Sequence, residues 1–188
     1  MTPLPLGILA LAGVTGGGGA YDLLESETLT SGVSNITFDN LDTYSDYQHL
    51  QIRLVGKTTA YPGFYLRFNS DTGSNYAMQR LFANGTNVTS AALTNWDTMI
   101  FVNSLPDESS TSNEFGAAVA DILDFSNSSK HTTVRMLSGA VYDDYPTIAL
   151  HSGLWENTNA VTSIEIIEPS SGTFVAGSRF GLYGSKGA

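Results

Sequence analysis

The chain has 188 residues, a length that suits one domain, or one domain with an arm. It contains no Cys, which excludes disulfides and thiolate metal sites, and its net charge of −10 with scattered Lys and Arg disfavours direct nucleic-acid binding. Apolar residues make up 41% and charged residues 14%, so the chain is predicted to fold, with Ser, Thr, Asn and Gly in place of charge.

The opening segment carries no charged side chain before Asp22. A signal peptide needs a basic region that this segment lacks, and Pro3 and Pro5 disfavour an early helix. A membrane span needs about 20 continuous apolar residues, and Gly16–Gly19 interrupts the run. We therefore interpret residues 1–20 as an extended assembly arm. The aliphatic residues expected to anchor it on a partner are Leu4, Leu6, Ile8, Leu9, Leu11 and Val14. The alternative is an arm that folds back over its own domain.

Residues 21–188 are predicted to form one β-domain, because alternating apolar patterns recur every 10–15 residues with turn residues between them. No helical periodicity lasts more than two turns. The expected strands are 21–29, 33–38, 49–55, 64–68, 76–82, 98–102, 114–125, 131–141, 147–155, 161–168 and 173–183. The strand 76–82 is expected to pair back on 64–68, and Gly177 is expected to mark a bulge in the last strand.

Ten or eleven strands without helices predict an all-β fold, and a jelly-roll-like antiparallel β-sandwich is the best match. The small residues of 114–125, among them Gly116, Ala118 and Ala120, suggest close packing beneath a second sheet. An immunoglobulin-like sandwich is disfavoured, because the Cys–Trp–Cys pattern is missing.

The residues that carry chemistry do not form a recognisable site. His49, His131 and His151 lack metal-ligand spacing, and no G-x-S-x-G occurs. The loop from Asp71 to Asn75 offers oxygen ligands for Ca²⁺, but it lacks the length and the Glu of an EF-hand and is interpreted as a turn. We expect no catalysis, no cofactor and no metal.

One predicted loop has the composition of a contact surface. Two acids stand between two aromatic residues, and the four are Tyr142, Asp143, Asp144 and Tyr145. Aromatic and carboxylate side chains together can bind sugars, contact another subunit or form a solvated turn. The sequence leaves these three readings open.

Several segments resemble a family of small structural proteins of tailed bacteriophages. The similar pieces are PLGILALAGVTGGGGAYDLLES, YQHLQIRLVGK, LRFNSDTGSNYAMQRLFANG, FGAAVADILDFSNSSKHTTVRMLSG and HSGLWENTNAVTSIEIIEPSSGTFVAGSRFGLYGSKGA. Together they cover most of the chain as diffuse patterns without a catalytic signature. The resemblance implies a virion protein that is assembled in the host cytoplasm, and it offers no site residue to carry over.

These observations lead to one hypothesis and two alternatives. We expect a capsid decoration (cement) protein, a homotrimer that clamps the major capsid protein or other virion proteins and contacts neither nucleic acid nor membrane. The first alternative is a tail, baseplate or fibre component. The second, of another class, is a secreted carbohydrate-binding module, in which sugars would quench the fluorescence of Trp96 or Trp155.

Overall fold

The computed structural model describes residues 20–102, 105–111, 113–142 and 145–187. They form twelve β-strands and one 3-10 turn, Leu41–Tyr44, and this described part of the chain holds no α-helix, which confirms the all-β class. The strands are β1 (Asp22–Thr28), β2 (Asn35–Phe38), β3 (His49–Gly56), β4 (Gly63–Phe68), β5 (Tyr76–Asn84), β6 (Asn87–Trp96), β7 (Met99–Val102), β8 (Gly116–Leu123), β9 (Thr132–Tyr142), β10 (Tyr145–Trp155), β11 (Ile164–Ile167) and β12 (Arg179–Ser185).

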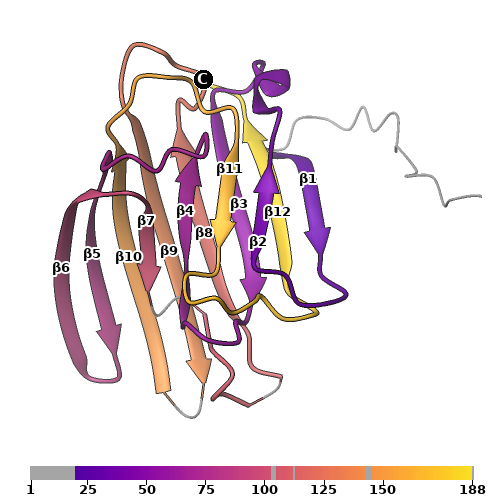
Figure 1. The fold of residues 1–188 in the computed structure, drawn as a ribbon, viewed down its shortest axis with the longest axis vertical. Helices are drawn as coiled ribbons and strands as arrows, with labels where there is room; N and C mark the ends of the chain where they lie inside the picture. The colour runs from indigo at the N-terminus through magenta and orange to yellow at the C-terminus, as the bar shows by residue number, and fades with distance from the viewer. Residues whose placement is uncertain (1–19, 103–104, 112, 143–144, 188) are drawn as a thin grey trace, which may run out of the picture.

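The strands form two antiparallel sheets (Figure 1). The larger sheet has the order β1-β12-β3-β8-β9-β10-β5-β6, and the smaller has the order β2-β11-β4-β7. The orders β1-β12-β3-β8 and β2-β11-β4-β7 are those of the two four-stranded sheets of a jelly roll, and the chain crosses between the sheets at most of its connections. This is the connectivity of a jelly roll, so the predicted architecture is confirmed.

Two hairpins widen the larger sheet beyond the eight strands of the jelly roll. The hairpin β9–β10 pairs with β8, and the hairpin β5–β6 pairs with β10. The turn of β5–β6 consists of Gly85 and Thr86, and Gly85 has a φ of 56°, which a residue without a Cβ adopts readily. The larger sheet therefore extends past the edge of the smaller one.

The core lies between the two sheets, and strand alternation explains which residues fill it. In β3, Leu50, Ile52 and Leu54 are buried, whereas Arg53 and Val55 point outward. Gly116, Ala118 and Ala120 of β8 are buried beside them, as the small residues of this segment predicted. The largest fully buried side chains are Trp155, Tyr76, Phe64, Phe68, Phe125, Phe174 and Phe180.

Three local predictions are wrong. The strand β6 was missed, because its mostly exposed residues lack alternation. The strands β4 and β5 do not pair but lie in different sheets, because Asn69 and Ser70, both with a φ of 51°, redirect the chain between them. The last strand begins at Arg179, and Gly177, with a φ of 88°, lies in the turn ahead of it rather than in a bulge.

Candidate functional site

The outer surface of the larger sheet, on the side away from the smaller sheet, carries many exposed aliphatic side chains. Strand register aligns four of them in a row across β8, β9, β10 and β5, since Val119 pairs with Leu137, Leu137 with Leu150, and Leu150 with Leu81. We define the outer apolar face as Val55, Leu81, Val88, Val119, Leu137, Val141, Ile148 and Leu150, whose exposed fractions run from 40% to 66%.

A second row lies next to the first on the same surface. Val55 pairs with Ala117, Ala117 with Gly139, and Gly139 with Ile148. Ile148 pairs with Ala83, and Ala83 with Val88. The two rows make one continuous surface over five neighbouring strands and β3. Contiguous apolar patches of this extent are rare on monomeric proteins and mark interaction sites.

The strands under this face carry apolar residues on both sides, together with the inward polar residues Ser138, Thr147 and His151. In β9, Met136 points into the core and Leu137 points outward; in β10, Ala149 points inward and Leu150 outward. A sheet with one solvated side normally alternates apolar with polar residues, and two apolar sides are typical of a sheet that is covered on both. The outward residues of these strands therefore depart from the pattern of a solvated sheet surface.

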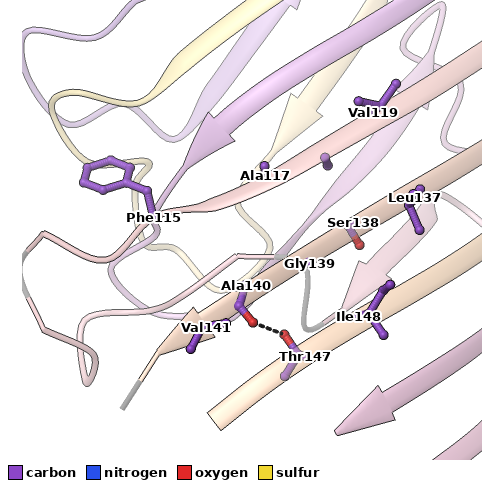
Figure 2. A pocket seen from close by; sticks show the side chains of 11 residues that line it. Phe115, Ala117, Val119, Leu137, Ser138, Gly139, Ala140, Val141, Thr147 and Ile148 are labelled. Atoms are coloured by element: carbon purple, nitrogen blue, oxygen red, sulfur yellow. Dashed lines mark hydrogen bonds between the residues drawn. The ribbon is translucent and has the colours of Figure 1, made fainter. Parts of the chain in front are cut away.

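The middle of the face is hollowed at a glycine (Figure 2). Gly139 forms the floor between Ala117 and Ile148, and a hollow of about 560 Å³ opens above it. A Cβ atom at this position would lie 3.0 Å from the carbonyl oxygen of Thr147. The missing side chain thus creates a shallow apolar depression in which a partner's side chain can sit.

A polar border, defined as Gln51, Arg53, Asp121 and Arg135, closes one side of the face. Gln51 Nε2 donates to Asp121 Oδ1 at 2.7 Å, and Arg53 Nε donates to Gln51 Oε1 at 2.6 Å. Arg135 pairs with Asp121 at 3.9 Å. Asp121 is the one carboxylate between two guanidinium groups, so the border carries an excess of positive charge.

The site residues predicted from the sequence either fall outside the described residues or stand at the adjoining ends of β9 and β10. The arm residues Leu4, Leu6, Ile8, Leu9, Leu11 and Val14 fall outside the described residues, as do Asp143 and Asp144 of the predicted contact loop. Tyr142 is the last residue of β9 and Tyr145 is the first residue of β10, and the two pair in register. Sequence reasoning missed the outer apolar face. The face could have been recognised from β8, β9 and β10, because apolar residues occur at both the inward and the outward positions of these strands.

The Asp71 loop is a turn, as interpreted, and its carboxylate is fully engaged by protein donors. Oδ1 accepts from the backbone N–H of Gly73, and Oδ2 accepts from Asn75 Nδ2 and Trp155 Nε1, each at 2.8 Å. Burial favours the neutral acid, but these hydrogen bonds outweigh it and hold the pKa of Asp71 below its usual value. A carboxylate that holds three donors is poorly placed to bind a cation.

The histidines take separate structural positions. His49 Nδ1 accepts from the backbone N–H of Asp124 at 2.9 Å. His151 is buried on the inner side of β10, next to Arg80, and burial followed by the charge of Arg80 lowers its pKa to about 4. Among the residues that the structure describes, no three His, Asp or Glu side chains are grouped to hold a metal ion.

A smaller depression opens on the inner side of the larger sheet, at β4, β5 and β6. We define the aromatic hollow as Tyr61, Tyr65, Arg80 and Trp96, which line about 250 Å³ together with Met78, Ala91 and Leu93. The rings of Tyr61 and Tyr65 meet edge to face at 6.2 Å. Trp96 is 42% exposed, whereas Trp155 is buried. Aromatic side chains around one guanidinium give this hollow stacking faces and hydrogen-bond donors.

Comparisons of the chain with protein-family models, with curated proteins and with solved structures give no match. Within the described ranges, no helix is long and apolar enough to span a membrane.

Proposed function

We propose that this chain is a structural protein of a bacteriophage particle, most specifically a decoration protein that clamps neighbouring subunits of the head. The outer apolar face is the single observation that carries the proposal, because a surface of this kind needs a protein partner. The choice of a bacteriophage particle rests on the resemblance of several segments to phage structural proteins. The proposal includes no catalysis and no cofactor.

The energy available from the face suggests how it is used. Burying an aliphatic side chain completely is worth about 1.5–3 kcal/mol. The eight side chains of the face are roughly half exposed, so covering them is worth on the order of 6–12 kcal/mol. Association costs about 4–15 kcal/mol in lost freedom. One face therefore binds weakly on its own, and repeated contacts on a lattice, or a homotrimer, would provide the additional affinity.

The location on the particle is tested by purifying phage particles, separating heads from tails and counting copies of the chain by quantitative mass spectrometry. The decoration proposal expects hundreds of copies on heads. A handful of copies on tails would reject it in favour of a tail, baseplate or fibre component, and a chain missing from both fractions would reject a virion role altogether.

The role of the face is tested by rebinding purified chain to heads that lack it. Replacing Leu137 and Leu150 together by Ser should weaken binding at least tenfold, because two central side chains of the face lose their apolar contacts. The matched control is Trp96→Ser, which removes an exposed apolar side chain from the aromatic hollow instead. Equal binding by the double variant and the unaltered chain would contradict the proposal.

The aromatic hollow favours a second candidate of another class, a carbohydrate-binding module. Tyr61, Tyr65 and Trp96 offer stacking faces of the kind that bind sugar rings, and Arg80 offers donors for hydroxyl oxygens. A neutral sugar would quench the fluorescence of Trp96 while leaving that of the buried Trp155 unchanged. Trp96→Phe should abolish the change. A glycan array without a binder removes this candidate.

A further inference from the structure

We infer that the free edge of β6 pairs antiparallel with the β6 edge of a second copy of this chain, about a two-fold axis that passes through Ser90. The inference goes beyond the proposed function, because it names a contact between copies that needs no phage particle. It rests on the described residues of β6 and on a comparison of the edge strands of the two sheets.

Three of the four edge strands are protected against pairing. The edges are β1 and β6 in the larger sheet and β2 and β7 in the smaller one. Proteins protect such edges, whose backbone N–H and C=O groups are unpaired, by keeping them short or by placing charges on them. β2 and β7 have four residues each. β1 has seven, but it carries Asp22, Glu25 and Glu27, whose like charges would repel across a shared edge.

The fourth edge strand, β6, has none of these protections. It is ten residues long and contains neither a charged residue nor a proline. Among the described strands it pairs with β5 alone, and it lies at the end of the larger sheet that is opposite to β1 (Figure 1). In an antiparallel ladder alternate residues direct their N–H and C=O groups to the same neighbour. About half of the backbone groups of β6 therefore face away from β5, where no described strand pairs with them.

The regular part of β6 has its midpoint at Ser90. Register with β5 is continuous over residues 87–93, and the irregularity of this hairpin lies beyond them, toward Trp96. In an antiparallel pair of identical strands, the residue on the two-fold axis lies opposite its own copy. An axis at Ser90 therefore uses the whole regular stretch, and it places Val88 of each copy opposite Ala92 of the other.

The side chains of this stretch are compatible with the same stretch of a second copy. Val88, Ser90 and Ala92 lie on the outer side of the sheet, and Thr89 and Ala91 lie on the inner side. Side chains opposite each other in a sheet share one side, so the axis at Ser90 keeps outer residues with outer ones. Over residues 88–92 the pairing brings together only small or β-branched neutral side chains.

Symmetry favours a second copy over a strand of another protein. An antiparallel edge is complementary to itself, and an isologous contact of this kind closes at two copies. Both edges that the larger sheets of such a pair leave free are β1, whose acidic residues repel each other, so the sheet does not grow further. The pair is a dimer and would replace the homotrimer expected from the sequence.

The pairing also changes how the outer apolar face is presented. Because Ser90 lies opposite Ser90 on the outer side, the outer surfaces of both copies lie on the same side of the joined sheet. Val88, a member of the outer apolar face, stands on the paired strand itself. The dimer thus offers two such faces side by side to one partner, and two linked contacts bind more tightly than one.

Sedimentation of the purified chain between low-micromolar and millimolar concentrations tests the pairing. We expect a monomer–dimer equilibrium, which Ser90→Lys should weaken about tenfold, because each lysine lies opposite its own copy. Ser90→Glu should do the same, and an equimolar mixture of the two variants should recover the dimer. The matched control is Ser152→Lys, exposed on the outer side of β10 and two strands from the edge, which should leave association unchanged.

The register is tested by disulfide formation, because the chain has no Cys of its own. Val88→Cys and Ala92→Cys are oxidised separately and as a mixture, and covalent dimers are followed on a non-reducing gel. The mixture should crosslink about tenfold faster than either variant alone, since only the mixture places two thiols opposite each other. Equal rates would overturn the pairing about Ser90.

The sedimentation experiment can overturn the inference in three ways. A monomer at every concentration would exclude pairing between copies, and a trimer would exclude a closed two-fold pair. A dimer that Ser90→Lys leaves intact would lie elsewhere, and its loss in the variant with Leu137→Ser and Leu150→Ser would place it on the outer apolar face. Neither experiment uses a phage particle, so their outcome is independent of the copy number on heads that tests the proposed function.

Discussion

The indole Nε1 of Trp155 donates a hydrogen bond of 2.8 Å to Oδ2 of Asp71. Trp155 is fully buried in the core near Phe68 and Tyr76, with ring centroids at 5.6 Å and 6.4 Å. Asp71 belongs to the turn that carries the chain from β4 in the smaller sheet to β5 in the larger one. The bond therefore connects the aromatic core to the crossing between the two sheets.

Replacing Asp71 by Asn should lower the free energy of unfolding at pH 7 by about 2–4 kcal/mol, because an ionised acceptor of three hydrogen bonds is lost. A carboxyl whose folded pKa is depressed stabilises the protein above its unfolded pKa, about 3.9, and loses this contribution as the pH falls through the folded pKa. The difference between the two proteins should shrink below about pH 4. Urea denaturation at pH 7 and pH 3 measures it.

The control for this prediction is Asp46→Asn, which changes the same charge at an exposed position. It should alter the free energy of unfolding by less than about 0.5 kcal/mol. A loss for Asp71→Asn that stays constant down to pH 2.5 would show that packing, and not the ionised carboxylate, is responsible.

Replacing His151 by Leu should remove a pH dependence of stability. The folded pKa of His151, about 4, lies below its unfolded value of about 6.5. Between these values the unfolded chain binds a proton that the folded chain does not, so stability is complete above about pH 6.5 and falls as the pH drops toward 4. The loss attributable to this residue is on the order of 3 kcal/mol.

Thermal or urea unfolding at several pH values between 4 and 7.5 measures this slope. The matched variant is His131→Gln at an exposed position, which leaves His151 in place and should keep the slope. An unchanged slope in His151→Leu would place the responsible proton on another group.

Replacing Glu168 by Ala should cost about 2–4 kcal/mol of stability, because the buried carboxylate accepts from three backbone N–H groups that would lose their partner. Oε1 accepts from Tyr61 at 2.9 Å, and Oε2 accepts from Ser170 at 2.9 Å and Gly172 at 2.7 Å. The urea midpoint measures the loss. Glu156→Ala, at an exposed position, is the control, and equal midpoints for the two variants would disprove a special role of Glu168.

Replacing Gly153 by Val should destabilise the protein by about 1–3 kcal/mol through overpacking. A Cβ atom at Gly153 lies 2.8 Å from Sδ of Met99, which is fully buried on β7. Ser152→Val, next to it on the outer surface, is the control and should be tolerated. Shortening Met99 to Ala in the Gly153→Val background should recover part of the loss. Additive losses in the double variant would rule out the contact.

Alternation predicted most strands, because a two-layer sandwich buries every second residue of β3, β4 and β8. It failed for β6, an edge strand whose residues are mostly exposed and whose pattern therefore has no period. It also failed to predict which strands pair. β4 and β5 are close in sequence, yet their partners are set by the sandwich as a whole, and the left-handed residues Asn69 and Ser70 are ordinary Asn and Ser in the sequence.

The outer apolar face could be predicted only in part. Each strand shows its outward residues, such as Val119 and Leu137, but the row that they form depends on register between strands far apart in the chain. Leu81 and Leu150 meet across β5 and β10, about seventy positions apart. No local sequence pattern shows that two residues so far apart in the chain are neighbours in the sheet. The turn at Asp71 could be predicted because it depends only on its own few residues.

The pairing of β1 with β12 has a consequence for how the chain folds. Asp22 pairs with Gly184, so the first described strand completes its hydrogen bonds only with the last one. During synthesis β1 must wait until β12 has left the ribosome, and closing so long a loop delays the event further. Until then β3 has a free edge of its own. Folding should accordingly be slow and sensitive to the rate of translation, and crowded nascent chains have time to mispair.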